Sequence, residues 1–225
     1  MYTSWHDKMS SCLLWIHSKP RFGKSTLAGA IQRSLQHAER DYTTADFFYS
    51  SRGGPNETNH KLMLQSILFQ LLDQNKRSQS LYNAFRASFR KLSGLGPGDI
   101  IWSYEEPKAV LLCLSTSSES SVHIDSQHKF LILIDGLDES EEKTADSPER
   151  ATVLRLLSRL YSGNVQRIFK IIALSRVERG ITRYLKPTHS IDMKHVNKHD
   201  IEGVVRIGIT HLRRCISFSL IIPLT

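Results

Sequence analysis

Hydrophobic residues along the chain fall into short continuous runs that alternate with amphipathic stretches. The clearest runs are 12–16, 130–134 and 168–174, and polar residues flank each of them. Apolar runs of this length are typical of strands buried on both faces of a parallel sheet. Two weaker runs, 45–49 and 189–193, predict one further strand each.

Between these runs, apolar residues recur at helical spacing. Leucine, alanine and isoleucine return every three or four positions over 24–37, which predicts a helix there. The same periodicity predicts further helices over 62–72, 81–92, 105–114, 148–161 and 200–213.

The alternation of strands with helices predicts an α/β fold of three layers, with a mainly parallel central sheet and helices on both faces. Residues 1–190 are expected to form the core of this domain. Residues 191–225 are expected to add a last short strand, an exit helix and a tail of the kind that truncation of a longer protein would leave. The serine-rich stretch 115–127 is interpreted as an exposed connection.

The segment between the first predicted strand and the first predicted helix has the form of a phosphate-binding loop. Residues 18–25 align with the pattern G-x-x-x-x-G-K-[ST], in which backbone N–H groups at a helix start converge on phosphates. Lys24 is predicted to reach the β- and γ-phosphates, and Ser25 to offer its hydroxyl oxygen to Mg²⁺. The residues predicted to bind the nucleotide are Ser18, Lys19, Pro20, Arg21, Phe22, Gly23, Lys24, Ser25 and Thr26.

Two positions of this loop depart from the pattern. Ser18 stands where the first glycine is expected, and Arg21 stands where a glycine is common. If Ser18 adopts a left-handed backbone conformation, the strain costs about 1–2 kcal/mol. Arg21 can contact phosphate directly, or its bulk can crowd the loop. The stretch 23–26 can also be read as a surface loop that simply opens a helix.

An acidic cluster follows the strand predicted over 130–134. Asp135 comes at the carboxyl end of that strand, where open α/β sheets place their ligands, and is predicted to bind Mg²⁺ partly through water. Asp138 or Glu139 is predicted to orient or deprotonate an attacking water.

The next predicted strand leads into Arg176. This arginine could face the γ-phosphate and sense its loss, or it could form a surface ion pair with the acidic cluster. Glu141 and Glu142, which end the cluster, are interpreted as solvated loop residues.

Together these motifs resemble a known family. The stretch 14–26 is similar to the phosphate loop of fungal NACHT-type NTPases, which are also classed with the nephrocystin-like N-terminal domain. Residues 135–139 resemble that family's extended acidic motif, and Arg176 matches its sensor position. Weaker similarity brings the covered region to roughly 5–214, through the stretches 45–53, 63–72 and 197–201.

The resemblance implies a P-loop NTPase fold and a signal-transducing switch of the STAND kind. In such a switch, ATP or GTP with Mg²⁺ holds one conformation, and loss of the γ-phosphate favours another. It also implies self-association or partner proteins bound through regions absent from this chain. The alternative, motivated by Ser18 and Arg21, is a non-catalytic scaffold or fragment that acts as a protein-interaction module.

Composition narrows the class of protein. Hydrophobic residues make up 40% and charged residues 23% of the 225, which is ordinary for a soluble globular domain. The three cysteines form no CxxC pair, so a reducing compartment is expected rather than a disulfide framework or a zinc site. The apolar runs are too short to cross a bilayer, so we expect a cytoplasmic protein without a membrane partner.

Charge adds one further consideration. The net charge is +8, and the stretch 150–186 is mostly basic where it is charged at all. A solvated mixed surface accounts for this excess as well as a polyanionic partner does. Because no nucleic-acid recognition signature accompanies the charge, a nucleic-acid partner is not favoured.

Overall fold

The computed structural model describes residues 10–37, 42–75, 86, 103–116, 129–141, 150–162 and 168–195. Within them, one sheet is formed by β1 (Cys12–His17), β2 (Tyr42–Phe48), β3 (Lys129–Asp135), β4 (Ile168–Ser175) and β5 (His189–Asp192). The order across the sheet is β2-β3-β4-β1-β5, and every pair of neighbours is parallel.

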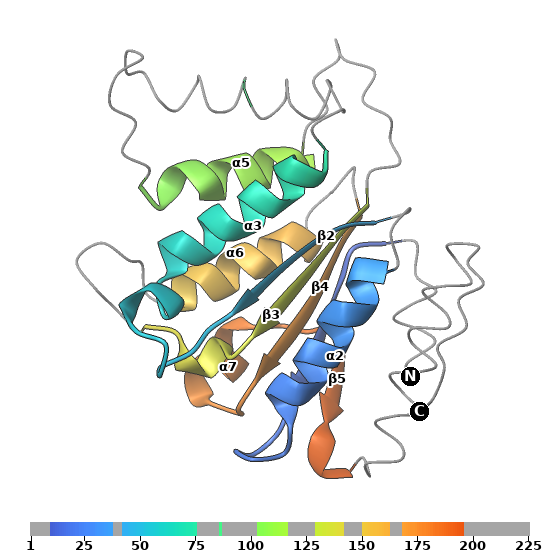
Figure 1. The fold of residues 1–225 in the computed structure, drawn as a ribbon, viewed down its shortest axis with the longest axis vertical. Coiled ribbons are helices and arrows are strands. Elements are labelled where there is room, and N and C mark those ends of the chain that lie inside the picture. The colour runs from blue at the N-terminus through green and yellow to red at the C-terminus, as the bar shows by residue number, and fades with distance from the viewer. Residues whose placement is uncertain are drawn as a thin grey trace.

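Helices cover both faces of this sheet, which confirms the predicted three-layer α/β fold. The α-helices are α2 (Lys24–His37), α3 (His60–Gln74), α5 (Glu105–Thr116), α6 (Arg150–Ser162) and α7 (Arg179–Tyr184). Short 3-10 turns occur at η1 (Pro55–Glu57), η2 (Leu137–Glu139) and η3 (Met193–His195). Among the described helices, α2 covers one face of the sheet, and α3, α5, α6 and α7 cover the opposite face (Figure 1). None of the described helices is both long and apolar enough to cross a bilayer.

The two faces of the sheet carry separate hydrophobic cores because side chains alternate along each strand. In β3, Phe130 and Ile132 pack with α3, α5 and α6, whereas Leu131 and Leu133 pack with α2. All four side chains are fully buried. The continuous apolar run therefore reflects burial on both faces, as the sequence predicts.

Most predicted elements are confirmed to within a few residues. The helix predicted over 62–72 begins earlier, at His60, because the Asn59 side chain accepts hydrogen bonds from the backbone N–H groups of Lys61 and Leu62 and caps the helix. The helices predicted over 81–92 and 200–213, together with the tail, lie outside the described elements.

The prediction that residues 115–127 form an exposed connection is wrong at Ser115, and 117–127 lie outside the described residues. Ser115 does not begin an exposed loop: it lies buried in the last turn of α5, and its hydroxyl donates to the Leu112 carbonyl at 2.7 Å. The short helix α7 was not predicted, since its six residues are too few for a clear helical period.

The carboxyl ends of β1 and β4 lie at a point where the chain changes direction across the sheet. β1 and β4 are neighbours, but the chain leaves β1 toward β2 on one side and leaves β4 toward β5 on the other. In open α/β sheets the crevice for ligands forms at the carboxyl ends of two such strands. The predicted phosphate loop follows β1 at this edge, and Arg176 follows β4.

Candidate functional site at the carboxyl edge of the sheet

The loop between β1 and α2 turns sharply at two residues. Arg21 has a φ of 69° and Gly23 a φ of 77°, and Arg21 is the one non-glycine residue with positive φ in the described part of the chain. The left-handed conformation considered for Ser18 is therefore wrong, and the strain falls on Arg21. Ser18 is instead buried, and its backbone N–H donates to the Ser175 carbonyl at 3.4 Å, which ties the loop to β4.

Lys24 folds back into this loop. Its ammonium group donates to the carbonyl and the hydroxyl of Ser18 and to the carbonyl of Lys19, each at 3.3 Å. Burial lowers the pKa of the Lys24 ammonium, and the nearby carboxylate of Asp138 acts in the opposite direction. The Lys24 ammonium therefore lies at the centre of the loop, within the electrostatic reach of the acidic cluster.

Ser25 lies near Asp135 at the carboxyl edge of the sheet. Asp135 ends β3 and is 3% exposed. Burial raises the pKa of its carboxyl, and hydrogen bonds from the Ser25 side chain and the Gly136 backbone partly offset this rise. The Ser25 side chain therefore lies near the Asp135 carboxyl, although β4 separates β3 from β1, the strand that leads to α2.

Gly136 allows the chain to turn immediately after Asp135. Its φ is 72°, and a Cβ at this position would lie 2.6 Å from the backbone oxygen of Tyr49. Tyr49 itself donates its backbone N–H to the Asp135 carbonyl at 2.9 Å. Only glycine satisfies both the positive φ and this close approach of two backbones.

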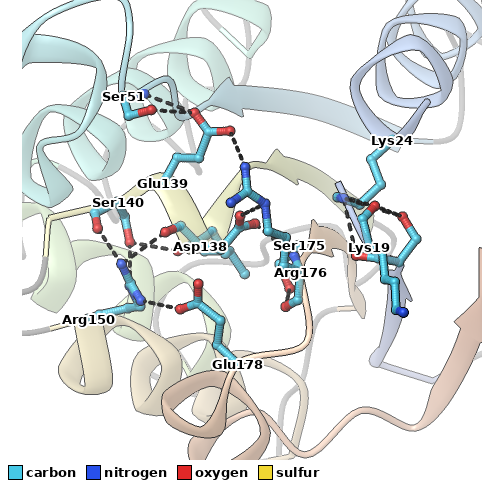
Figure 2. Close-up of polar contacts among 12 residues, drawn as sticks. Lys19, Lys24, Ser51, Asp138, Glu139, Ser140, Arg150, Ser175, Arg176 and Glu178 are labelled. Carbon is cyan, nitrogen blue, oxygen red and sulfur yellow. Dashed lines mark hydrogen bonds and ion pairs between the residues drawn. The ribbon is translucent and has the colours of Figure 1, made fainter. Parts of the chain in front are cut away.

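Asp138 is held by Arg176, as Figure 2 shows. One carboxylate oxygen of Asp138 lies 3.1 Å from the Arg176 Nε, and the other accepts the Arg176 backbone N–H at 2.8 Å. The side chain of Asp138 is 3% exposed, against 45% for Arg176. Of the two interpretations of Arg176, the ion pair with the acidic cluster is the one present in this conformation.

Glu139 is held by the turn that follows β2. Its Oε2 accepts from both the backbone N–H and the hydroxyl of Ser51, each at 3.0 Å, and Arg176 lies 3.8 Å from its other oxygen. These bonds, led by the Ser51 backbone N–H, lower the pKa of the Glu139 carboxyl. A carboxylate with a lowered pKa is a weaker base, so Glu139 is poorly suited to take a proton in this conformation.

Arg150 forms hydrogen bonds with the loop that carries the acidic cluster, and this role was not predicted from the sequence. Its guanidinium donates to the hydroxyl and carbonyl of Ser140, to the carbonyl of Asp138 and to the carboxylate of Glu178, at 2.6–3.1 Å. The side chain is only 12% exposed. A signal was available, because a cation in the first turn of a helix opposes the helix dipole and needs another reason to be there.

A buried hydrogen-bonded chain lies behind the acidic cluster as well. The Tyr49 hydroxyl and the His60 Nδ1 are 2.8 Å apart, and the His60 Nε2 lies 2.8 Å from the Glu141 carbonyl. Because a carbonyl only accepts, Nε2 carries the proton and Nδ1 accepts from Tyr49. Burial lowers the pKa of His60 to about 4, which keeps the ring neutral. Glu141 also accepts from Thr58 at 2.9 Å, so its interpretation as a solvated loop residue is wrong; Glu142 lies outside the described residues.

Oxygen ligands for a hard cation are present, but few. Within the described ranges no group of three or more His, Cys, Asp and Glu side chains is arranged to hold a metal ion. The hydroxyl of Ser25 and the carboxylate of Asp135 are oxygens that lie near each other and within electrostatic reach of Lys24. This set resembles the needs of Mg²⁺, which keeps several waters and takes one or two protein oxygens.

Comparison with known proteins identifies one relationship. The sequence model of a family described as nephrocystin 3, N-terminal, matches residues 1–176, which is more than half of the chain. No curated protein matches the chain significantly.

Proposed function

The chain belongs to the nephrocystin 3, N-terminal family, and from that premise we propose that it binds a nucleoside triphosphate, ATP or GTP, with Mg²⁺ at the carboxyl edge of its sheet. The proposal assigns the phosphates to the loop of residues 18–25 and the start of α2. It assigns Mg²⁺ to Ser25 and Asp135.

One arrangement carries the proposal: the Ser25 side chain lies near the buried Asp135 carboxyl, and the Lys24 ammonium lies within electrostatic reach of Asp135 and Asp138. A hydroxyl, a carboxylate and an ammonium that converge at a helix start are the groups that Mg²⁺ and a phosphate require. The residues present therefore fit the cation. Its chemistry when bound is to neutralise charge on the phosphate oxygens.

The hydrogen bonds that the Lys24 ammonium makes in this conformation are long, which supports its role in phosphate binding. Its three hydrogen bonds, to Ser18 and Lys19, are all 3.3 Å long, which is beyond the usual range for N–H···O bonds. Phosphate oxygens carry charge and are stronger acceptors than the carbonyls and the hydroxyl that Lys24 now contacts. The 14-residue helix α2 also has no acidic residue in its first turn, so no carboxylate opposes an anion there.

Arg176 supports a switch as a second part of the proposal. A guanidinium pairs equally well with a carboxylate or a phosphate, so Arg176 can exchange Asp138 for a phosphate oxygen. Asp138 would then be free to orient or deprotonate water. In this account, the conformation with Arg176 on Asp138 and Glu139 is the resting one.

A non-catalytic scaffold is the competing function, and two observations favour it. Arg21 strains the phosphate loop with its φ of 69°, and the carboxylates of Asp138 and Glu139 are both engaged. Such a scaffold would show weak nucleotide binding or binding without turnover. Replacement of both Ser18 and Arg21 by glycine would then be expected to improve affinity.

A titration of the purified chain with fluorescently labelled ATP and GTP, with and without Mg²⁺, tests the proposal. We expect binding that Mg²⁺ strengthens. Lys24→Ala should weaken it roughly 10- to 100-fold, the value of a hydrogen-bonded charge. Arg33→Ala, which removes an exposed cation from the same helix, is the matched control and should leave affinity unchanged. Equal affinities in the wild type and the Lys24 variant would refute the assignment of the phosphates to this loop.

A further inference from the structure

The outer surface of α6 and α7 gathers positive charge without a carboxylate. The two helices contact each other on the face of the sheet opposite α2 (Figure 1). Residues 151–162 and 179–188 contain no Asp or Glu. The exposed cations, here called the cationic surface, are Arg155, Arg159, Arg179, Arg183 and Lys186.

The cationic surface is continuous across the two helices because one tyrosine joins them. The guanidinium carbons of Arg155 and Arg183 lie 4.6 Å and 5.4 Å from the centroid of the Tyr184 ring. Ser158 of α6 donates to the Tyr184 carbonyl at 3.2 Å, and the Tyr161 hydroxyl donates to the Lys186 carbonyl. Two guanidinium groups from different helices are thus held against one ring.

Among the described residues, the cations of the cationic surface lack the ion pairs that several other cations form. Lys108, Arg150 and Arg176 each form an ion pair. No member of the cationic surface pairs with a carboxylate in the described part of the chain. Cations within one Debye length of each other, about 8–10 Å at physiological salt, repel, and an external anion would relieve that repulsion.

We propose that the cationic surface docks an acidic helical segment of a partner protein. Its cations come in rows with one-turn spacing: Arg155 and Arg159 on α6, and Arg179 and Arg183 on α7. Glutamates four residues apart on a partner helix repeat at the same spacing, so one such row can face one row of arginines. Guanidinium groups pair with carboxylates through two parallel hydrogen bonds, which favours a partner rich in Glu or Asp.

A nucleic acid fits this surface less well. Proteins that bind single strands combine cations with exposed aromatic rings for stacking, and here the Tyr184 ring already contacts two guanidinium groups. The 13-residue helix α6 is roughly 20 Å long, which spans only about six base pairs of a duplex.

Binding of a fluorescein-labelled alanine-rich helical peptide with glutamates four residues apart, followed by fluorescence anisotropy with the full chain, tests the proposal without reference to nucleotide. The double variant Arg155→Gln, Arg183→Gln should weaken binding about ten-fold, and added salt should weaken binding to the wild type. The matched control is Arg33→Gln, Lys194→Gln, which removes the same charge from exposed positions on α2 and η3. The control should change affinity by less than about two-fold.

Four outcomes would overturn the proposal. The first is no binding of the labelled peptide by the wild type, and the second is equal weakening of binding in the two double variants. The third and fourth are binding of duplex DNA, or of anionic vesicles, that is tighter than binding of the peptide and is lost in the Arg155, Arg183 variant. The last two would assign the surface to a nucleic acid or to a lipid headgroup. Thermal unfolding checks that both double variants remain folded. We expect that they do, because all four substitutions are at exposed positions.

Discussion

Asp138 and Arg176 are joined by two contacts. Their side chains form an ion pair at 3.1 Å, and the Arg176 backbone N–H donates to the Asp138 carboxylate at 2.8 Å. The pair joins the loop after β3 to the end of β4. It therefore ties two loops together at the carboxyl edge of the sheet, within electrostatic reach of the Lys24 ammonium.

The first prediction concerns Asp138→Asn. The substitution removes a negative charge beside the proposed phosphate site, so nucleotide affinity should stay the same or rise by about two-fold. Any turnover should fall by roughly ten-fold or more, because the amide cannot take a proton from water. Labelled-nucleotide titration and phosphate release measure the two quantities separately. A loss of affinity would show that Asp138 holds the ligand rather than assisting its hydrolysis.

Replacement of the strained loop residue should stabilise the chain. Arg21→Gly removes a side chain from a position with a φ of 69°, and we expect the free energy of unfolding to rise by about 1 kcal/mol. Gly23→Ala, at a φ of 77° with open space around the added Cβ, should lower it by a similar amount. Urea unfolding of both variants checks the pair. A stabilised Gly23→Ala would contradict the conformation of the loop.

Gly136→Ala should be more damaging than Gly23→Ala. The added Cβ meets both a positive φ and the Tyr49 backbone oxygen at 2.6 Å, so we expect a loss of about 2–4 kcal/mol in unfolding free energy. Gly180→Ala provides the control, since its Cβ would meet nothing within 4 Å and alanine favours the helix. If the two alanine variants unfold at the same urea concentration, the close approach at Gly136 is not real.

The buried ring of His60 predicts a dependence of stability on pH. Its folded pKa is about 4, below the usual 6.5, so between these values the unfolded chain binds more protons than the folded one. Stability contributed by the neutral ring is therefore fully present above pH 6.5 and is lost as the pH falls toward 4, by on the order of 2–3 kcal/mol. Urea unfolding across this range measures the slope. His60→Gln should flatten the slope, and a slope that persists unchanged would assign it to other groups.

The fold could be predicted from the sequence because its strongest signals are local. Apolar runs such as 130–134 mark strands, and the spacing over 24–37 marks a helix whose observed bounds, Lys24–His37, are the same. The placement of Ser25 near Asp135 is consistent with a simple rule, since the carboxyl ends of parallel strands share one edge of the sheet.

The remaining features depend on contacts between distant segments and leave little trace in the sequence. Which loop residue takes a positive φ depends on how the chain enters α2, and here it is Arg21 rather than Ser18. The Glu139–Ser51 and Arg150–Glu178 contacts join segments that no local pattern relates. Burial of Glu141 against Thr58 is of the same kind.

The position of β1 in the sheet has a consequence for synthesis on the ribosome. Its two neighbours are β4 and β5, so Cys12 pairs with Lys170 and Leu14 with His189. The strand that leads into the loop of residues 18–25 is therefore made before the other described strands of the sheet, and it has no partner strand there until β4 has been made. At translation rates of about 5–20 residues per second this wait lasts roughly ten seconds or more, during which a nascent apolar segment is open to chaperones.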